Sequence, residues 1–179
     1  MRIGFDAKRA FSNYTGLGNY SRDTIRVLHK YYPENQYYLF TPKVISNPRL
    51  DFIKNKNNLH VISPNKFIDR IFPSFWRSKN IIKDLQKNKI DLYHGLSHEL
   101  PIGIEKTNIK KIVTIHDLIY LRYPNLFSSI DRNIYDKKFR YACEKSDKII
   151  AVSNQTKEDI ISFFNIDDDK IDVIYQGCN

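Results

Sequence analysis

Long apolar stretches are absent from this sequence of 179 residues, in which no uninterrupted apolar run exceeds four residues. A helix that spans a bilayer needs about 20 apolar residues, so no segment of this sequence can form one. Residues 1–6 also lack the apolar core and the small-residue cleavage site of a signal peptide. We therefore expect a location in the cytoplasm.

Cysteine is scarce, since the sequence contains only Cys143 and Cys178. Neither belongs to a C-x-x-C pair or has the spacing of metal ligands, so we interpret both as free thiols. Several catalytic patterns are missing as well: there is no P-loop, no third glycine of the dinucleotide motif, and no Ser-His-Asp or H-E-x-x-H arrangement. The missing P-loop argues against a nucleoside triphosphatase, and the missing third glycine argues against the dinucleotide-binding motif.

Positive charge, by contrast, is abundant: 29 Lys and Arg against 20 Asp and Glu give a formal net charge of +9. Residues 43–90 hold eleven of these basic residues and three Asp, a net charge of +8. A basic surface attracts nucleic acid, anionic lipid or a phosphorylated substrate. A solvated lysine surface is the alternative interpretation. No helix-turn-helix, zinc-finger or RNP pattern is present, so we do not expect nucleic acid as a partner.

Short apolar segments alternate with segments of helical periodicity along the chain. Strands are predicted at residues 1–6, 37–41, 59–63, 90–94, 109–116, 148–152 and 170–175, and helices at residues 18–31, 75–87, 129–145 and 154–164. A polar loop is predicted at residues 9–18. This alternation predicts a Rossmann-like, doubly wound α/β fold, with a mainly parallel sheet covered by helices on both faces.

The polar segment Thr15-Gly16-Leu17-Gly18-Asn19 follows the first predicted strand and opens the first predicted helix. Ligands of parallel α/β sheets bind at the carboxyl ends of the strands. Two glycines allow the backbone to approach a ligand closely, and a helix N-terminus offers N–H groups to an anion. The alternative is a tight turn in which glycine supplies a positive φ.

Three later strands of the prediction also end in polar residues, namely His94, the pair His116-Asp117, and Ser153 with Thr156. His116 can hydrogen-bond a substrate hydroxyl or a developing charge, and Asp117 can orient its ring. We therefore take these two as the candidate proton-transfer residues. A structural hydrogen bond explains His94 equally well, and a helix cap explains Ser153. We interpret His98 as a loop residue.

Together these segments resemble the N-terminal half of the family 4 (group 1) GT-B glycosyltransferases. The matching residues, in order, are 3–7, 15–20, 91–94, 113–117, 151–153 with Thr156, and 173–177. They are most similar to mannosyltransferase-like enzymes of surface-polysaccharide biosynthesis. Two positions depart from that pattern, since Lys8 stands where arginine is usual and Asn19 where arginine is frequent.

The resemblance implies that residues 1–179 form a single Rossmann-like, acceptor-side domain of a retaining enzyme. The C-terminal, donor-binding domain with its E-x7-E motif would be absent from this chain, which alone would be inactive. The complete enzyme would move a sugar from a nucleotide-sugar donor to a glycan or lipid-linked acceptor, without a metal or other cofactor.

The resemblance also implies that Gly16 and Gly18 approach the donor phosphates or the acceptor, and that His116 contacts the transferred sugar. Together with the polar residues at the strand ends, this gives a predicted site. Its catalytic residues are His116 and Asp117, and its substrate-binding residues are Thr15, Gly16, Leu17, Gly18, Asn19, His94, Ser153 and Thr156. The alternative is a stand-alone, non-catalytic module that binds a phosphorylated sugar or another anionic ligand.

Residues 67–79 interleave aromatic and basic side chains. This composition suits the interface of an anionic membrane, where aromatic rings insert and Lys or Arg meets lipid phosphates. We therefore predict a protein that lies peripherally on the inner face of the cytoplasmic membrane. The residues expected to face it are Phe72, Phe75, Trp76, Arg77 and Lys79. The alternative is that these aromatic residues pack on the sheet.

Overall fold

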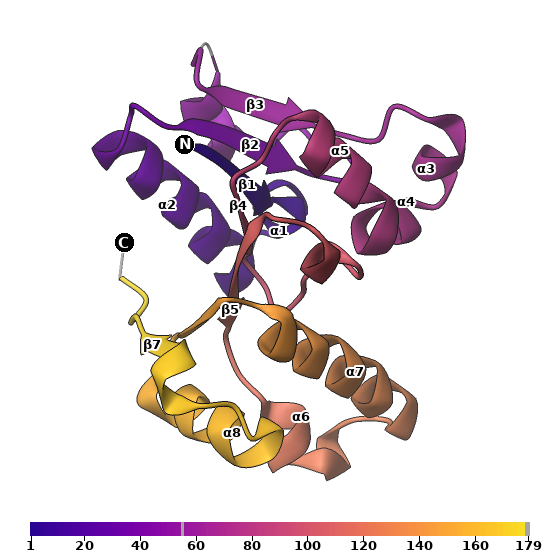
Figure 1. Cartoon of the computed structure of the whole chain (residues 1–179), viewed down its shortest axis with the longest axis vertical. Helices are drawn as coiled ribbons and strands as arrows, with labels where there is room; N and C mark the ends of the chain where they lie inside the picture. Colours follow the sequence, from indigo (N-terminus) through magenta and orange to yellow (C-terminus); the bar gives the residue numbers. More distant parts are fainter. Residues whose placement is uncertain (55, 178–179) are drawn as a thin grey trace. The chain divides into compact units, whose positions relative to one another are not determined.

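A computed structural model describes residues 1–54 and 56–177 of the chain, which divides into two compact units (Figure 1). Unit 1 comprises residues 1–94 and 101–109, and unit 2 comprises residues 95–100 and the chain from Lys110 onward. Each unit is built from parallel strands and helices. Within the part of the chain that is described, no helix is both long and apolar enough to cross a membrane.

Unit 1 contains four parallel strands in the spatial order β3-β2-β1-β4. The strands are β1 (Arg2–Asp6), β2 (Gln36–Phe40), β3 (Leu59–Ile62) and β4 (Leu92–Gly95). The α-helices are α1 (Lys8–Ser12), α2 (Gly16–Tyr31), α3 (Phe67–Ile71), α4 (Pro73–Phe75) and α5 (Ile81–Lys87). Shorter turns are η1 (Pro48–Ile53), the π-helical η2 (Trp76–Asn80) and η3 (Ile104–Lys106).

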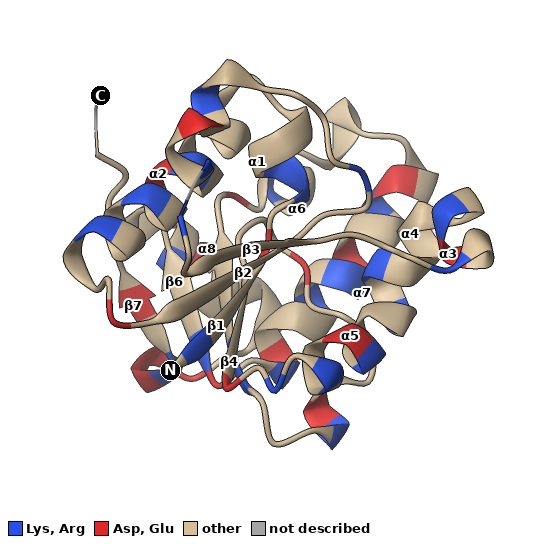
Figure 2. Ribbon diagram, turned by 90° about the horizontal axis from the view of Figure 1, so that it is seen from above, with Lys and Arg blue, Asp and Glu red and all other residues tan. Residues whose placement is uncertain are grey.

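The order of the strands places helices on both faces of the unit 1 sheet. The chain runs outward from β1 through β2 to β3 and then returns to β4. Because crossovers between parallel strands are right-handed, the outward helix α2 and the returning helix α5 lie on opposite faces (Figure 2). Nearly every side chain of a strand is buried when helices cover both faces of the sheet. Phe5, Tyr37 and Leu39 are fully buried for this reason.

Unit 2 contains three parallel strands in the order β5-β6-β7. The strands are β5 (Lys110–Ile115), β6 (Lys148–Ala151) and β7 (Ile171–Val173). The connections contain α6 (Ile119–Arg122), η4 (Pro124–Leu126), α7 (Ser129–Lys145), α8 (Asn154–Phe164) and η5 (Asp168–Lys170). Its core is formed by Ile115, Ile149 and Ile160, each of which is fully buried.

The predicted α/β class is confirmed, and α7 and α8 have the predicted bounds. The prediction of a loop over residues 9–18 is wrong, because this stretch contains most of α1 and the start of α2. Ala10 and Phe11 are buried, so a polar-looking segment gains a helical turn from the packing of two apolar side chains. Cys143 is a buried free thiol, whereas the same prediction for Cys178 lies outside the described residues.

The aromatic and basic segment differs from its prediction at two of its five residues. Trp76 is fully buried, and its Nε1 donates to Asp84 Oδ2 at 2.7 Å. The Arg77 side chain is 11% exposed and donates from Nε to Asp6 Oδ2 at 2.9 Å. The prediction that Trp76 and Arg77 face a membrane is therefore wrong, since both are held by carboxylates within unit 1.

Candidate functional site

Asn13 organises the loop that leads into α2. Its Oδ1 accepts hydrogen bonds from the Thr15 N–H at 2.8 Å, the Thr15 hydroxyl at 2.9 Å and the Gly18 N–H at 3.2 Å. Neither Gly16 nor Gly18 has a positive φ. The alternative explanation of these glycines as a positive-φ turn is therefore excluded, because a side-chain cap closes the turn instead.

The two glycines at the start of α2 differ in what surrounds them. A Cβ added to Gly18 would lie 1.9 Å from the carbonyl oxygen of Asn13, so the packing of the chain itself requires glycine there. A Cβ added to Gly16 would meet nothing within 4 Å, and Gly16 is exposed. The first N–H groups of a helix have no intrahelical acceptor. Gly16 therefore leaves open space over a terminus that can bind an anion.

Two arginines converge on Asn19, one of the positions that departs from the family pattern. Asn19 Oδ1 accepts from Arg22 Nη2 at 2.6 Å and from Arg49 Nη1 at 3.1 Å. Arg22 also donates to the carbonyl oxygens of Ala10 and Asn13, at 2.8 and 2.7 Å. Burial, assisted by the charge of Arg49, lowers the pKa of Arg22. Positive charge thus lies beside the N-terminus of α2. The sequence indicated Arg49 only as one basic residue of the 43–90 stretch, and it did not single out Arg22.

Of the other predicted residues in this loop, Thr15 is exposed and Leu17 is half-buried. His94 lies on β4 in unit 1, is 5% exposed, and packs at 5.9 Å between ring centroids against Phe5 of β1. The surroundings of His94 agree with the structural interpretation, and contact with substrate stays a prediction for all three residues.

In unit 2, His116 follows the last residue of β5, and both of its ring nitrogens are hydrogen-bonded. Nε2 lies 3.0 Å from the carbonyl oxygen of Leu96, and Nδ1 lies 2.9 Å from Nε2 of Gln176. A carbonyl oxygen only accepts, so the ring proton is on Nε2 and Nδ1 accepts from the Gln176 amide. This arrangement holds a neutral imidazole in one tautomer and one orientation.

Thr156, in contact with Ser153, holds the backbone of His116. The Thr156 hydroxyl donates to the carbonyl oxygen of His116 at 3.1 Å. The Ser153 hydroxyl lies 3.0 Å from the Thr156 hydroxyl. Ser153 Oγ also accepts from the Thr156 N–H, which caps α8. The structure thus connects three predicted site residues in unit 2, and it confirms the capping role considered for Ser153.

A tight loop, residues 95–100, supports the His116 ring. Gly95 is required in it, because an added Cβ would lie 2.1 Å from the carbonyl oxygen of Glu99. His98 has a φ of 62°, and its N–H donates to the Thr114 carbonyl oxygen at 2.9 Å. Its ring stacks on Phe139 and lies 5.1 Å, between centroids, from the ring of His116. His98, interpreted from the sequence as a loop residue, is therefore part of the packing around His116.

Asp117 does not have the orienting role that the sequence predicts. The ring nitrogens of His116 bond to Leu96 and Gln176, whereas Asp117 Oδ1 accepts from the Ile119 N–H at 3.3 Å, at the start of α6. The predicted orienting role is wrong, and a direct catalytic role for Asp117 stays a prediction. Sequence analysis did not single out Leu96 or assign a role to Gln176.

Two other features of the described residues are a buried thiol and an apolar pocket. Within the described ranges, no group of three or more His, Cys, Asp and Glu side chains could hold a metal ion. Burial raises the pKa of Cys143 to about 12, so its thiol stays protonated and is a poor nucleophile.

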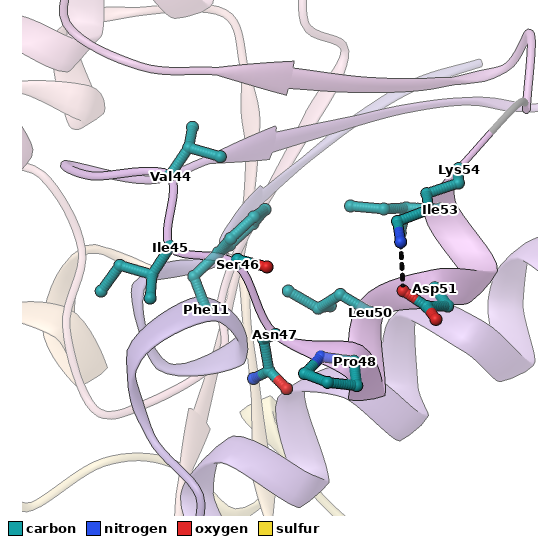
Figure 3. Close-up of a pocket in the computed structure, with 10 residues that line it drawn as sticks. All are labelled: Phe11, Val44, Ile45, Ser46, Asn47, Pro48, Leu50, Asp51, Ile53 and Lys54. Atoms are coloured by element: carbon teal, nitrogen blue, oxygen red, sulfur yellow. Dashed lines mark ion pairs between the residues drawn. The ribbon is translucent and has the colours of Figure 1, made fainter.

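A pocket of about 250 Å³ in unit 1 is lined by apolar side chains such as Phe11, Val44 and Leu50, with an Asp51–Lys54 ion pair beside them (Figure 3).

Comparison with known proteins decides the family. The family model of glycosyltransferase family 4 matches residues 14–179. The chain belongs to glycosyltransferase family 4. The match contains the N-terminus of α2, His94 and the whole His116 cluster, so every candidate site residue of this family 4 chain lies within it. No curated protein matches the chain.

Solved structures agree with this family 4 fold. A glycosyltransferase from Rickettsia africae ESF-5 is 18% identical with a TM-score of 0.58, and the alignment covers 99% of this chain and 43% of that one. The wall teichoic acid polymerase TagF is 14% identical with a TM-score of 0.54, over 97% of this chain and 39% of that one. At these identities the likeness shows the fold. The family 4 chain spans less than half the length of either structure.

Proposed function

We propose that this chain is the acceptor-side domain of a retaining glycosyltransferase that moves a sugar from a nucleotide-sugar donor to a glycan or lipid-linked acceptor. The observation that carries the proposal is that the residues around His116 fix its position and its protonation. The Leu96 carbonyl fixes the tautomer of the ring, Thr156 holds the backbone carbonyl, and the ring packs beside His98. The chain spans 43% of the Rickettsia africae glycosyltransferase, so the proposal assigns donor binding to further sequence of the full-length protein.

In the proposed reaction, the leaving group is a nucleoside diphosphate, and its negative charge must be stabilised as the sugar becomes oxocarbenium-like. The N-terminus of α2 offers N–H groups for this purpose, with Arg22 and Arg49 adding positive charge beside them. No metal or other cofactor is included in the proposal.

His116 acts in this proposal as a neutral hydrogen-bond partner of the transferred sugar. The Leu96 carbonyl holds Nε2–H, so Nδ1 is the atom that would accept from a sugar hydroxyl. Gln176, which bonds to Nδ1 here, is exposed and would yield that position to substrate. By resemblance, the proposal extends to a mannosyltransferase-like enzyme of surface-polysaccharide biosynthesis in the cytoplasm.

Substitution of the two glycines of α2 tests the proposal, because one substitution is expected to affect substrate binding and the other to affect folding. Gly16→Ala adds a methyl group in open space, so we expect an unchanged unfolding midpoint and a loss of roughly tenfold or more in kcat/KM of the full-length enzyme. Gly18→Ala places the methyl group against the Asn13 carbonyl, so we expect the midpoint itself to fall. Turnover of a panel of nucleotide sugars is the activity measured. Unchanged activity in a folded Gly16→Ala enzyme would contradict the proposed role of this terminus.

A further inference from the structure

Unit 1 exposes five large apolar side chains within nine residues on and between α3 and α4. Their exposed fractions are 77% for Phe67, 65% for Ile68, 53% for Ile71, 59% for Phe72 and 48% for Phe75. We name this surface the 67–75 face; α3 and α4 lie at the edge of unit 1 in Figure 1. A cluster of exposed apolar side chains of this density is typical of a surface that meets a partner.

The apolar side chains of the 67–75 face are held outward, because the inward side of the same segment is already occupied. Trp76 fills the core below it and bonds to Asp84. Asp69 is buried, and its Oδ1 accepts from Asn80 Nδ2 at 2.6 Å. Arg77 then bonds to Asp6 at the end of β1. These contacts anchor the segment to unit 1 while its five apolar side chains stay exposed.

The charge around the 67–75 face has one sign. Lys66, Arg70 and Lys79 are exposed beside it, and Lys79 Nζ lies 6.0 Å from the ring centroid of Phe75. Asp69 is the one acidic residue between positions 63 and 83, and its carboxylate is buried and hydrogen-bonded. Figure 2 shows basic residues on α3 and beside α4. The face therefore presents apolar groups and cations together, with no exposed carboxylate among residues 63–83.

We propose that the 67–75 face docks on the surface of an anionic lipid bilayer. The apolar side chains enter the boundary between headgroups and acyl chains, and the three cations meet lipid phosphates. This assignment adds Phe67, Ile68 and Ile71 to the residues that face the membrane, and it omits Trp76 and Arg77. Docking does not depend on sugar transfer; the proposed function adds only that a lipid-linked acceptor would be presented at this surface.

Co-sedimentation of the chain with vesicles tests the docking proposal. The probes are vesicles of phosphatidylcholine alone and of equal parts phosphatidylcholine and phosphatidylserine, at low salt. The wild-type chain binds the anionic vesicles, and Phe67→Ser with Ile68→Ser lowers its partition coefficient roughly tenfold or more. The matched control is Leu126→Ser with Ile130→Ser in unit 2, whose side chains are 74% and 70% exposed. This control keeps wild-type binding.

Charge variants test the electrostatic half of the proposal. Lys66→Gln with Lys79→Gln weakens binding to anionic vesicles, whereas Lys56→Gln with Lys87→Gln, which removes two exposed cations elsewhere in unit 1, has a smaller effect. Equal binding to neutral and anionic vesicles, or equal loss in both apolar variants, would overturn the proposal. So would a dimer in sedimentation velocity that Phe67→Ser with Ile68→Ser dissociates, without vesicle binding, since a second copy would then cover the face.

Discussion

His116→Ala lowers kcat/KM of the full-length enzyme by about 100-fold or more and leaves it folded, because it removes a fixed polar partner of the transferred sugar. The neutral ring is held by the Leu96 carbonyl, and Thr156 holds the backbone carbonyl of His116. These two contacts remain when substrate replaces Gln176 at Nδ1, so the ring stabilises the transition state without reorganising. The measurement is turnover of the preferred nucleotide sugar, with the unfolding midpoint recorded alongside.

The matched control for the loss of an imidazole is His60→Ala in unit 1. His60 is also half-buried and hydrogen-bonded, with its Nε2 2.8 Å from Gln36 Oε1, and it lies on β3. We expect the His60 variant to keep its turnover. Equal losses in both variants, or an unchanged rate in folded His116→Ala, would show that His116 has only a structural role.

Asp6→Asn lowers the free energy of unfolding by about 3 kcal/mol, because it leaves the Arg77 guanidinium buried without its carboxylate. The side chains of Asp6 and Arg77 are 4% and 11% exposed, and Arg77 Nε lies 2.9 Å from Asp6 Oδ2. This ion pair ties the end of β1 to the η2 turn, 71 residues along the chain. Urea unfolding followed by circular dichroism measures the effect.

Asp51→Asn is the control for Asp6→Asn, since it removes the same charge from an exposed ion pair. The side chains of Asp51 and Lys54 are 60% and 70% exposed, at 2.7 Å. Solvent screens such a pair, so the expected change is within about 0.5 kcal/mol. A loss of similar size in both variants would contradict the role assigned to the buried Asp6–Arg77 pair.

Regular elements of the fold were predictable where capping and periodicity agree. Ser128 and Ser153 accept N–H bonds at the starts of α7 and α8, and both helices have the predicted bounds. Helix α1 was not predictable, because five residues are too few for a periodic signal and its stability depends on the burial of Ala10 and Phe11. Trp76 was misplaced because composition reveals an aromatic segment but not which of its side chains face the core.

The sequence predicted the side chains of the candidate site, but it did not predict the groups that hydrogen-bond to His116. Polar residues that follow strands indicated His116, Ser153 and Thr156, and hydrogen bonds connect these three. The Leu96 carbonyl carries no sequence signal, since every residue has one. Gln176 lies 60 residues from His116 along the chain, and no spacing rule relates them.

The proposed function depends on a contact between His116, at the carboxyl end of β5, and the sugar that is transferred from the nucleotide-sugar donor. The most direct test is a ¹H–¹⁵N spectrum of the imidazole groups of the full-length enzyme, recorded as a nucleotide sugar that it turns over is added. Of the histidines in this chain, His29 and His60 bond to Asn58 and Gln36 within unit 1 and serve as internal references. We expect the His116 resonances to shift as donor is added, while those of His29 and His60 stay unchanged. Unchanged His116 resonances at saturating donor would contradict the proposed contact.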